Sequence, residues 1–79
     1  MRTADEIFTE AFSVARNLRS PEYKRGVLAA LKFRLEGVKI PTPFPEGTAA
    51  SDAFYSGVDE GHAHWRSENE HAIKNHQTA

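Results

Sequence analysis

The chain has 79 residues, no cysteine and a net charge of −1 at neutral pH. This length supports one small domain with a modest core, and the absence of cysteine excludes disulfides and thiolate metal sites. No apolar run approaches the roughly 20 residues that span a bilayer, and the first residues lack the apolar segment of a signal peptide. We therefore expect a single helical domain over residues 1–79, soluble in a bacterial cytoplasm and without a membrane partner.

Charge is unevenly distributed along the sequence. Residues 1–15 hold one basic and three acidic side chains, a net −2, and residues 16–39 hold seven basic and two acidic side chains, a net +5. Residues 40–79 hold two basic and six acidic side chains, a net −4. The middle of the chain is therefore basic and both ends are acidic, a segregation that steers association without determining the fold.

The first predicted helix covers about residues 4–17. Thr3 followed by Glu6 forms a capping box, in which each side chain binds a backbone N–H at the start of a helix. Apolar residues then recur at helical spacing, namely Ile7, Phe8, Ala11, Phe12, Ala15 and Leu18.

The second predicted helix covers residues 21–36. Ser20 supplies an N-cap hydroxyl and Pro21 the first helical residue, and Gly37 predicts a left-handed C-cap. Gly26 lies inside this helix at a cost of roughly 1 kcal/mol relative to alanine. The close approach of another backbone would compensate for that cost.

Residues 38–47 contain three prolines and predict an extended, stiff connector. Ile40 and Phe44 are free to fold from this connector onto the core. The default interpretation of the segment is a structural strap; a proline-rich ligand for an aromatic groove is the alternative.

The third predicted helix covers about residues 49–73, with Thr48 or Ser51 as its N-cap and a frayed polar end at 74–79. Gly57 and Gly61 lie four residues apart on its apolar face, a spacing that lets a second helix, at Gly26, cross closely. The fold class is therefore an all-α, three-helix domain with a proline-rich extended connector between its second and third helices.

One face of the third helix could hold a metal. Glu60, His64, Glu68 and His71 are spaced four, four and three residues apart, and imidazole and carboxylate are ordinary zinc ligands. No HExxH motif is present, and Glu–His neighbours also stabilise an exposed helix without metal. We favour a solvated face with no metal and no cofactor; a metal-dependent structural protein built on His64 and His71 stays open.

No motif predicts catalysis. The serines have no GxSxG motif around them, and there is neither a phosphate loop nor a GxGxxG fingerprint. Asp59 and Glu60 are adjacent, and neighbouring side chains of a helix diverge by about 100°. We therefore expect a protein that is not an enzyme.

The basic middle of the chain could contact phosphate. It includes Arg16, Arg19, Lys24, Arg25, Lys32 and Arg34. Nucleic-acid binders usually carry a clear positive excess, which the acidic ends of this chain offset. We therefore expect a solvated helix face and no direct binding to nucleic acid.

The run from Gly26 to Gly61 resembles the ribosome modulation factor family and the related ciprofloxacin-resistance proteins. The matching positions are Gly26, Ala30, Gly37, Pro43, Phe44, Phe54, Gly57, Val58 and Gly61. The resemblance implies a helix–strap–helix unit, to which the first helix is added here. Thr42 replaces the family's cysteine and Val58 its second tryptophan, and this chain is slightly acidic where the family is strongly basic.

Residues 47–66 contain the pattern GT…DAF…G-x-x-E-G…WR. In this pattern the sequence resembles short reading frames of bacteriophages and prophages, among which anti-CRISPR proteins are a well-known class of this size and acidity. This resemblance implies a non-catalytic inhibitor of a host nucleoprotein complex, with a CRISPR–Cas effector as the favoured partner. The alternative is a ribosome- or RNA-binding modulator that uses the basic middle of the chain.

Two exposed surfaces are candidates for partner binding. The surface on the third predicted helix comprises Asp52, Tyr55, Asp59, Glu60 and Arg66. The surface on the second predicted helix comprises Arg25, Lys32 and Arg34. Carboxylates could mimic phosphates toward a basic groove, with Tyr55 as an aromatic anchor. We expect a monomer or a weak homodimer, which could pair through Phe33 or Tyr55.

Overall fold

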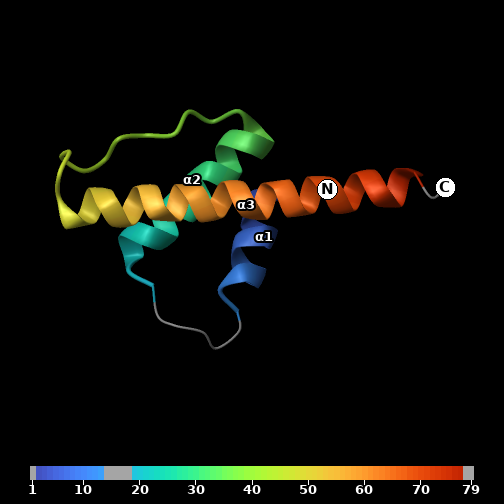
Figure 1. Ribbon diagram of the computed structural model, residues 1–79, viewed down its shortest axis with the longest axis horizontal. Helices are drawn as coiled ribbons and strands as arrows, with labels where there is room; N and C mark the ends of the chain where they lie inside the picture. The colour runs from blue at the N-terminus through green and yellow to red at the C-terminus, as the bar shows by residue number, and fades with distance from the viewer. Residues whose placement is uncertain (1, 14–18, 78–79) are drawn as a thin grey trace.

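A computed structural model describes the backbone of residues 2–13 and 19–77 and the side chains of 2–13 and 19–70. It contains three helices: α1 (Ala4–Ala11), α2 (Pro21–Glu36) and α3 (Ala49–Gln77). The described residues form no strand, so the predicted all-α, three-helix class is confirmed. α2 crosses α3 obliquely, and the C-terminal part of α3 extends beyond both other helices (Figure 1).

The helix starts follow the capping signals in the sequence. The Thr3 hydroxyl accepts from the Glu6 N–H at 3.1 Å, and the Glu6 carboxylate accepts from the Thr3 N–H at 2.8 Å. The second of these bonds is the main reason that the pKa of Glu6 lies below its ordinary value. Ser20 caps α2 through the Tyr23 N–H at 3.2 Å.

The start of α3 resolves the choice between its two possible caps. The Thr48 hydroxyl accepts from the Ser51 N–H at 3.1 Å, and the Thr48 carbonyl accepts from the Asp52 N–H at 3.0 Å. Thr48 is therefore the N-cap, and Ser51 is a buried residue of the first turn.

The predicted end of the first helix is wrong. α1 ends at Ala11 and not near Asn17, and Phe12 already has non-helical dihedral angles. The Ser13 hydroxyl donates to the Glu10 carbonyl at 2.9 Å, a local bond that competes with continuation of the helix. Residues 14–17 of the predicted helix lie outside the described residues.

The predicted end of the third helix is also wrong. α3 continues to Gln77, whereas we expected fraying from residue 74; residues 78–79 lie outside the described part. After Gly61 the helix contains neither glycine nor proline, and many of its residues are good helix formers. Polarity alone therefore does not end it.

The segment between α2 and α3 begins at Gly37, whose φ of 73° provides the predicted left-handed cap. The predicted extended connector over 38–47 is not confirmed as such, because the chain bends at Phe44 and turns at Glu46–Gly47, where Gly47 has a φ of 80°. Ile40 and Phe44 pack onto the core as expected. In Figure 1 this segment leaves the end of α2, arches beside α3 and returns to its start.

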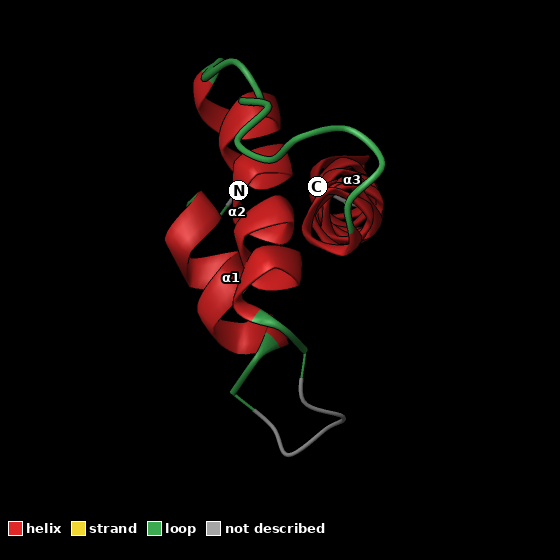
Figure 2. Cartoon of the chain, turned by 90° about the vertical axis from the view of Figure 1, so that its left-hand side faces the viewer, coloured by secondary structure: helices red, strands yellow, loops and turns green. Residues whose placement is uncertain are grey.

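Apolar side chains form two buried clusters. One lies between α1 and α2, centred on Ile7, Val27 and Leu31, with Trp65 of α3 packed against it. The other joins Ala30 of α2 to Phe54 and Val58 of α3 beneath the connector. Figure 2 looks along α3 and shows α1 and α2 on one side of it, so that a large part of α3 faces outward.

Glycines let the backbones of α2 and α3 touch. A Cβ added at Gly57 would lie 1.9 Å from the Tyr23 carbonyl oxygen, and one added at Gly26 would lie 1.9 Å from the Phe54 carbonyl oxygen. A Cβ at Gly61 would lie 2.5 Å from the Val27 carbonyl oxygen. Since no other residue fits these positions, the predicted close crossing at Gly26, Gly57 and Gly61 is confirmed.

Candidate functional site

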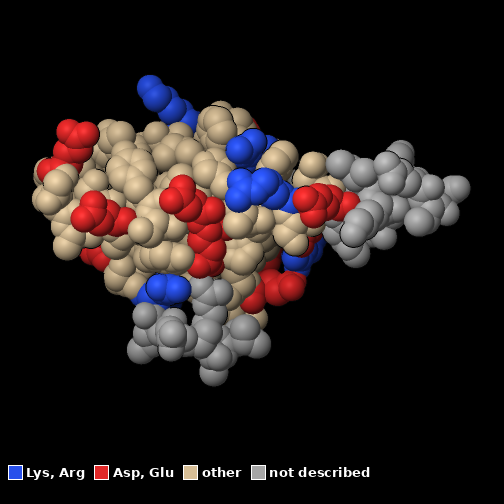
Figure 3. Space-filling model, viewed as in Figure 1, with Lys and Arg blue, Asp and Glu red and all other residues tan. Residues whose placement is uncertain are grey.

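The outward side of α3 carries a row of exposed polar and aromatic side chains. Asp52, Tyr55 and Asp59 are all exposed, and the Tyr55 residue retains 42% of its accessible surface. Their spacing of three and four residues places them on one side of the helix. We call these three residues the acidic flank. On the face drawn in Figure 3, acidic side chains spread over the region where α3 begins, and a basic group lies beside its middle.

The aromatic ring in the acidic flank is held by the core beneath it. Phe54 is fully buried, and its ring meets the Tyr55 ring edge-on at 5.2 Å between centroids. Phe44 packs against Phe54 from the connector at 6.0 Å. Tyr55 is therefore an exposed ring on a rigid base, as expected of a binding anchor.

Glu60 does not belong to the same surface as Asp59. The Tyr23 hydroxyl donates to one Glu60 oxygen at 2.6 Å, and the His64 Nε2 lies 2.8 Å from the other. Glu60 is half-buried, whereas Asp59 is exposed. One carboxylate oxygen of Glu60 therefore links α3 to α2 and the other bonds within α3, whereas the Asp59 carboxylate faces outward.

The three basic residues predicted on the second helix do not form one surface. The Arg34 side chain faces α3, with its Nε donating to His62 Nδ1 at 3.1 Å and its guanidinium 4.6 Å from the centre of the Trp65 ring. The Arg25 guanidinium lies 5.4 Å from the Phe44 ring centre, and Lys32 follows two turns later on the same side of α2. The predicted basic surface is thus divided between two sides of the helix.

His62 lies among cations. Its ring also meets the half-exposed Phe33 edge-on at 6.3 Å. Burial lowers the pKa of His62, the positive charges of Arg34 and Arg66 lower it further, and Asp59 partly opposes them. The neutral ring is the form that accepts the hydrogen bond from Arg34, so the neutral form is favoured in the folded protein.

The lowered pKa of His62 predicts that acid destabilises the protein. As the pH falls below about 6.5, the unfolded chain binds a proton at His62 before the folded chain does, so the contribution of this group to stability is complete above that pH and is lost as the pH falls through the folded-state pKa. We expect the advantage of the wild type over His62→Gln, whose amide oxygen can still accept from Arg34, to shrink between about pH 8 and pH 5. Urea unfolding of both proteins measures it. A difference that is constant with pH would contradict this prediction.

The proposed metal ligands are not assembled into a site among the described side chains. Glu60 and His64 bind each other, while Glu68 pairs with Arg2. Among the described residues, no group of three or more His, Asp or Glu side chains could hold a metal ion. The side chain of His71 lies outside the described residues, so the alternative built on His64 and His71 stays a prediction.

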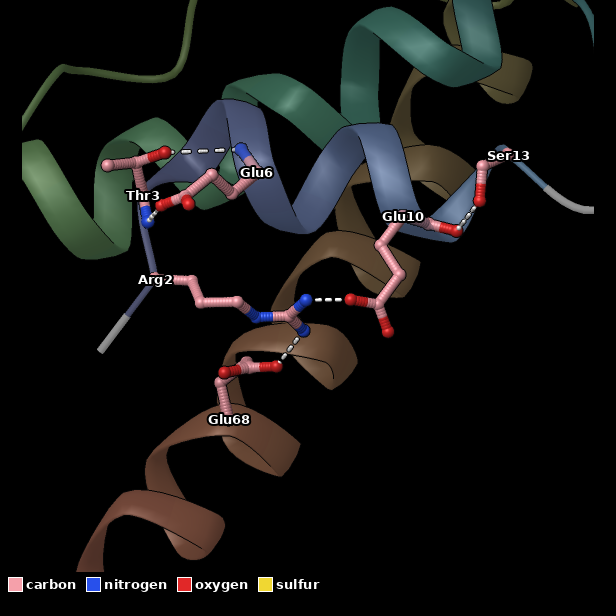
Figure 4. A network of polar contacts seen from close by, with 6 residues as sticks. All are labelled: Arg2, Thr3, Glu6, Glu10, Ser13 and Glu68. Carbon is pink, nitrogen blue, oxygen red and sulfur yellow. Dashed lines mark hydrogen bonds and ion pairs between the residues drawn. The ribbon is translucent and has the colours of Figure 1, made fainter.

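The N-terminal segment is tied to α3 by an ion-pair network. The Arg2 guanidinium lies between Glu10 of α1 and Glu68 of α3, and pairs with both (Figure 4). An open hollow of about 270 Å³ borders this network, with His64 and Ser67 also in its wall. The ion pairs of Arg2 in the wall of this hollow attach α1 to α3.

No activated nucleophile is seen in this hollow. Ser67 follows His64 by three residues, but no hydrogen bond links the two side chains in the described part of the structure. Nucleophilic catalysis requires a base within hydrogen-bond reach of the hydroxyl. The absence of enzymatic activity stays a prediction.

No helix within the described residues is both long enough and apolar enough to cross a membrane.

The comparisons add no relative: no family model matches the chain, and no curated protein and no solved structure matches it. The resemblances to ribosome modulation factor and to anti-CRISPR proteins therefore stay predictions.

The sequence singled out most of these residues but missed how they pair. Nothing in it linked Tyr23 to Glu60 or Arg34 to His62, because these contacts join residues 37 and 28 positions apart. Spacing along the helix could have identified His62 as a member of the exposed face of α3, since it lies three residues after Asp59 and four before Arg66. The same spacing extends the acidic flank into a longer row.

Proposed function

We propose that this chain is a non-catalytic binding protein that docks through the acidic flank onto a basic protein surface of a host nucleoprotein complex. The observation that carries the proposal is the exposed Tyr55 ring with a carboxylate one turn away on each side. An aromatic anchor supplies contact area, and carboxylates complement a basic groove.

The favoured partner is a CRISPR–Cas effector, which would make the protein a phage-encoded anti-CRISPR inhibitor that acts by occupying a surface. Such effectors hold nucleic acid in positively charged channels, which are the kind of surface that a row of carboxylates complements. The small size of the chain, its acidic ends and its resemblance to phage reading frames support this choice.

The test is capture of effector subunits by tagged protein from a nuclease-treated bacterial lysate, followed by measurement of affinity for the purified complex. We expect Tyr55→Ala to weaken binding by about 30-fold, as for a hot-spot residue worth about 2 kcal/mol. We expect the double variant Asp52→Asn/Asp59→Asn to lose more affinity at low salt than at high salt, since salt screens the attraction between exposed charges.

Phe33→Ala is the matched control, because Phe33 is 43% exposed and Tyr55 is 42% exposed, and Phe33 lies on α2 outside the acidic flank. Full affinity of the Tyr55 and aspartate variants would refute the surface assignment. Recovery of ribosomal proteins that disappear after nuclease treatment would instead support the ribosome- or RNA-binding alternative. That alternative has its own support in Arg25 and Lys32, which lie on one side of α2.

A further inference from the structure

The row that begins with the acidic flank continues along α3 with the opposite charge. Its members are Asp52, Tyr55, Asp59, His62 and Arg66, at intervals of three, four, three and four residues. This alternation keeps all five on one side of the helix. The row starts with carboxylates and ends with a guanidinium, so its charge reverses from one end to the other.

Such a row is complementary to itself when it is turned around. If a second copy approaches with its α3 antiparallel, the acidic start of one row faces the basic end of the other. With the two-fold axis between Asp59 and His62, Asp59 faces His62 of the second copy. Tyr55 then faces Arg66 of the second copy, and Asp52 lies one turn from that arginine. A two-fold interface must be self-complementary in this way, because each contact occurs twice.

We propose that in the free protein two copies of this chain pair through this row, with their α3 helices antiparallel. Among the described residues, Asp52, Asp59 and Arg66 take part in no salt bridge within the chain. Pairing would bring Asp52 of each copy within one turn of Arg66 of the other and set Asp59 against the His62 ring. It would also place Tyr55 against a guanidinium, an arrangement that aromatic faces favour.

The contact is small, so the dimer is weak. A single helix face buries less surface than the roughly 1,200–2,000 Å² of a standard stable interface, and affinity in such contacts depends on a few anchors. The dimer covers the acidic flank, so a partner competes with it for the same residues. The proposal does not require the function proposed above, because it concerns the purified protein alone.

Sedimentation velocity across the micromolar concentration range tests the proposal. We expect the wild-type mass to rise toward that of a dimer with concentration, and the rise to weaken in high salt. Asp52→Arg places two cations against each other across the interface, and Arg66→Asp places two carboxylates there. Each variant alone should stay monomeric.

The decisive sample is an equimolar mixture of the two reversed variants. Each copy of Asp52→Arg then faces a copy of Arg66→Asp, both pairs of charges are opposite again, and the dimer should return. Both positions are exposed, and thermal melting checks that each variant is folded. A wild-type monomer at every concentration, a dimer that survives both reversals, or a mixture that stays monomeric would each overturn the proposal.

Failure of this test leaves the proposed docking function intact, since a monomer still presents the acidic flank. Conversely, a dimer of the purified chain is compatible with a complete lack of effector binding. The two proposals are therefore separated by their samples, purified protein in one case and the effector complex in the other.

Discussion

Replacing Gly57 with alanine should destabilise the protein by about 3 kcal/mol or more, at the upper end of what overpacking costs. The new Cβ would lie 1.9 Å from the Tyr23 carbonyl oxygen, and a backbone atom of a helix cannot move aside as a flexible side chain can. The two helices must separate instead, which opens the cluster that joins Ala30 to Phe54 and Val58 and removes Trp65 from the other cluster. Chemical denaturation of the variant and the wild type measures the difference.

The direction of the change in stability distinguishes a close helix crossing from an ordinary exposed position. In an exposed helix, replacing glycine with alanine stabilises by roughly 1 kcal/mol, because alanine is the better helix former. The neighbouring Ser56 is exposed, so Ser56→Ala should raise the free energy of unfolding by a few tenths of a kcal/mol, about the difference between the propensities of the two residues. A Gly57→Ala variant that is as stable as the wild type would show that the helices do not cross at this residue.

Phe54→Ala should have the second large effect, a loss of about 3–5 kcal/mol. Phe54 is fully buried, and its ring anchors both the connector, through Phe44, and the exposed Tyr55 ring. A domain of this size has a total stability of about 4–12 kcal/mol at the usual value per residue, so the variant should lose a large share of it and melt well below the wild type.

Tyr55→Ala is the matched comparison, because it removes an adjacent ring from the surface of the same helix turn. Truncation there should cost less than about 1 kcal/mol, since surface substitutions away from special features change stability little. Melting temperatures of the two variants, compared with that of the wild type, test the pair. Equal losses would mean that the ring of Tyr55, and not only that of Phe54, is part of the core.

The sequence predicts the helix starts of this fold well, because the signals are local. The Thr3–Glu6 capping box acts within a few residues of itself, and so does the Ser20 cap. The spacing of Gly57 and Gly61 also predicts a close helix crossing without knowledge of the partner. The predicted ends of α1 and α3 were wrong because the observed ends depend on weak interactions. At the end of α1 this is a single serine hydroxyl, and at the end of α3 it is helix propensity.

The candidate site could be predicted only in part. Helical spacing shows which residues share a face of α3, whereas the contacts of those residues with α2 depend on how the two helices cross. Helical spacing correctly separates Asp59 from Glu60, yet it cannot tell which of the two is free to meet a partner. That outcome depends on where α2 crosses α3, which places the Tyr23 hydroxyl against Glu60. In the same way, the crossing turns Arg34 toward His62 and away from Arg25.

The glycine crossing also bears on the kinetics of capture. Sliding α3 along α2 by one residue would place a Cβ against the carbonyl that Gly57 now accommodates, so the pair has one register. The acidic flank is then already in its binding conformation before any encounter, and little conformational entropy remains to be lost on binding. Association of the monomer would need no rearrangement, and its rate would be set by diffusion and charge, with salt as its main control.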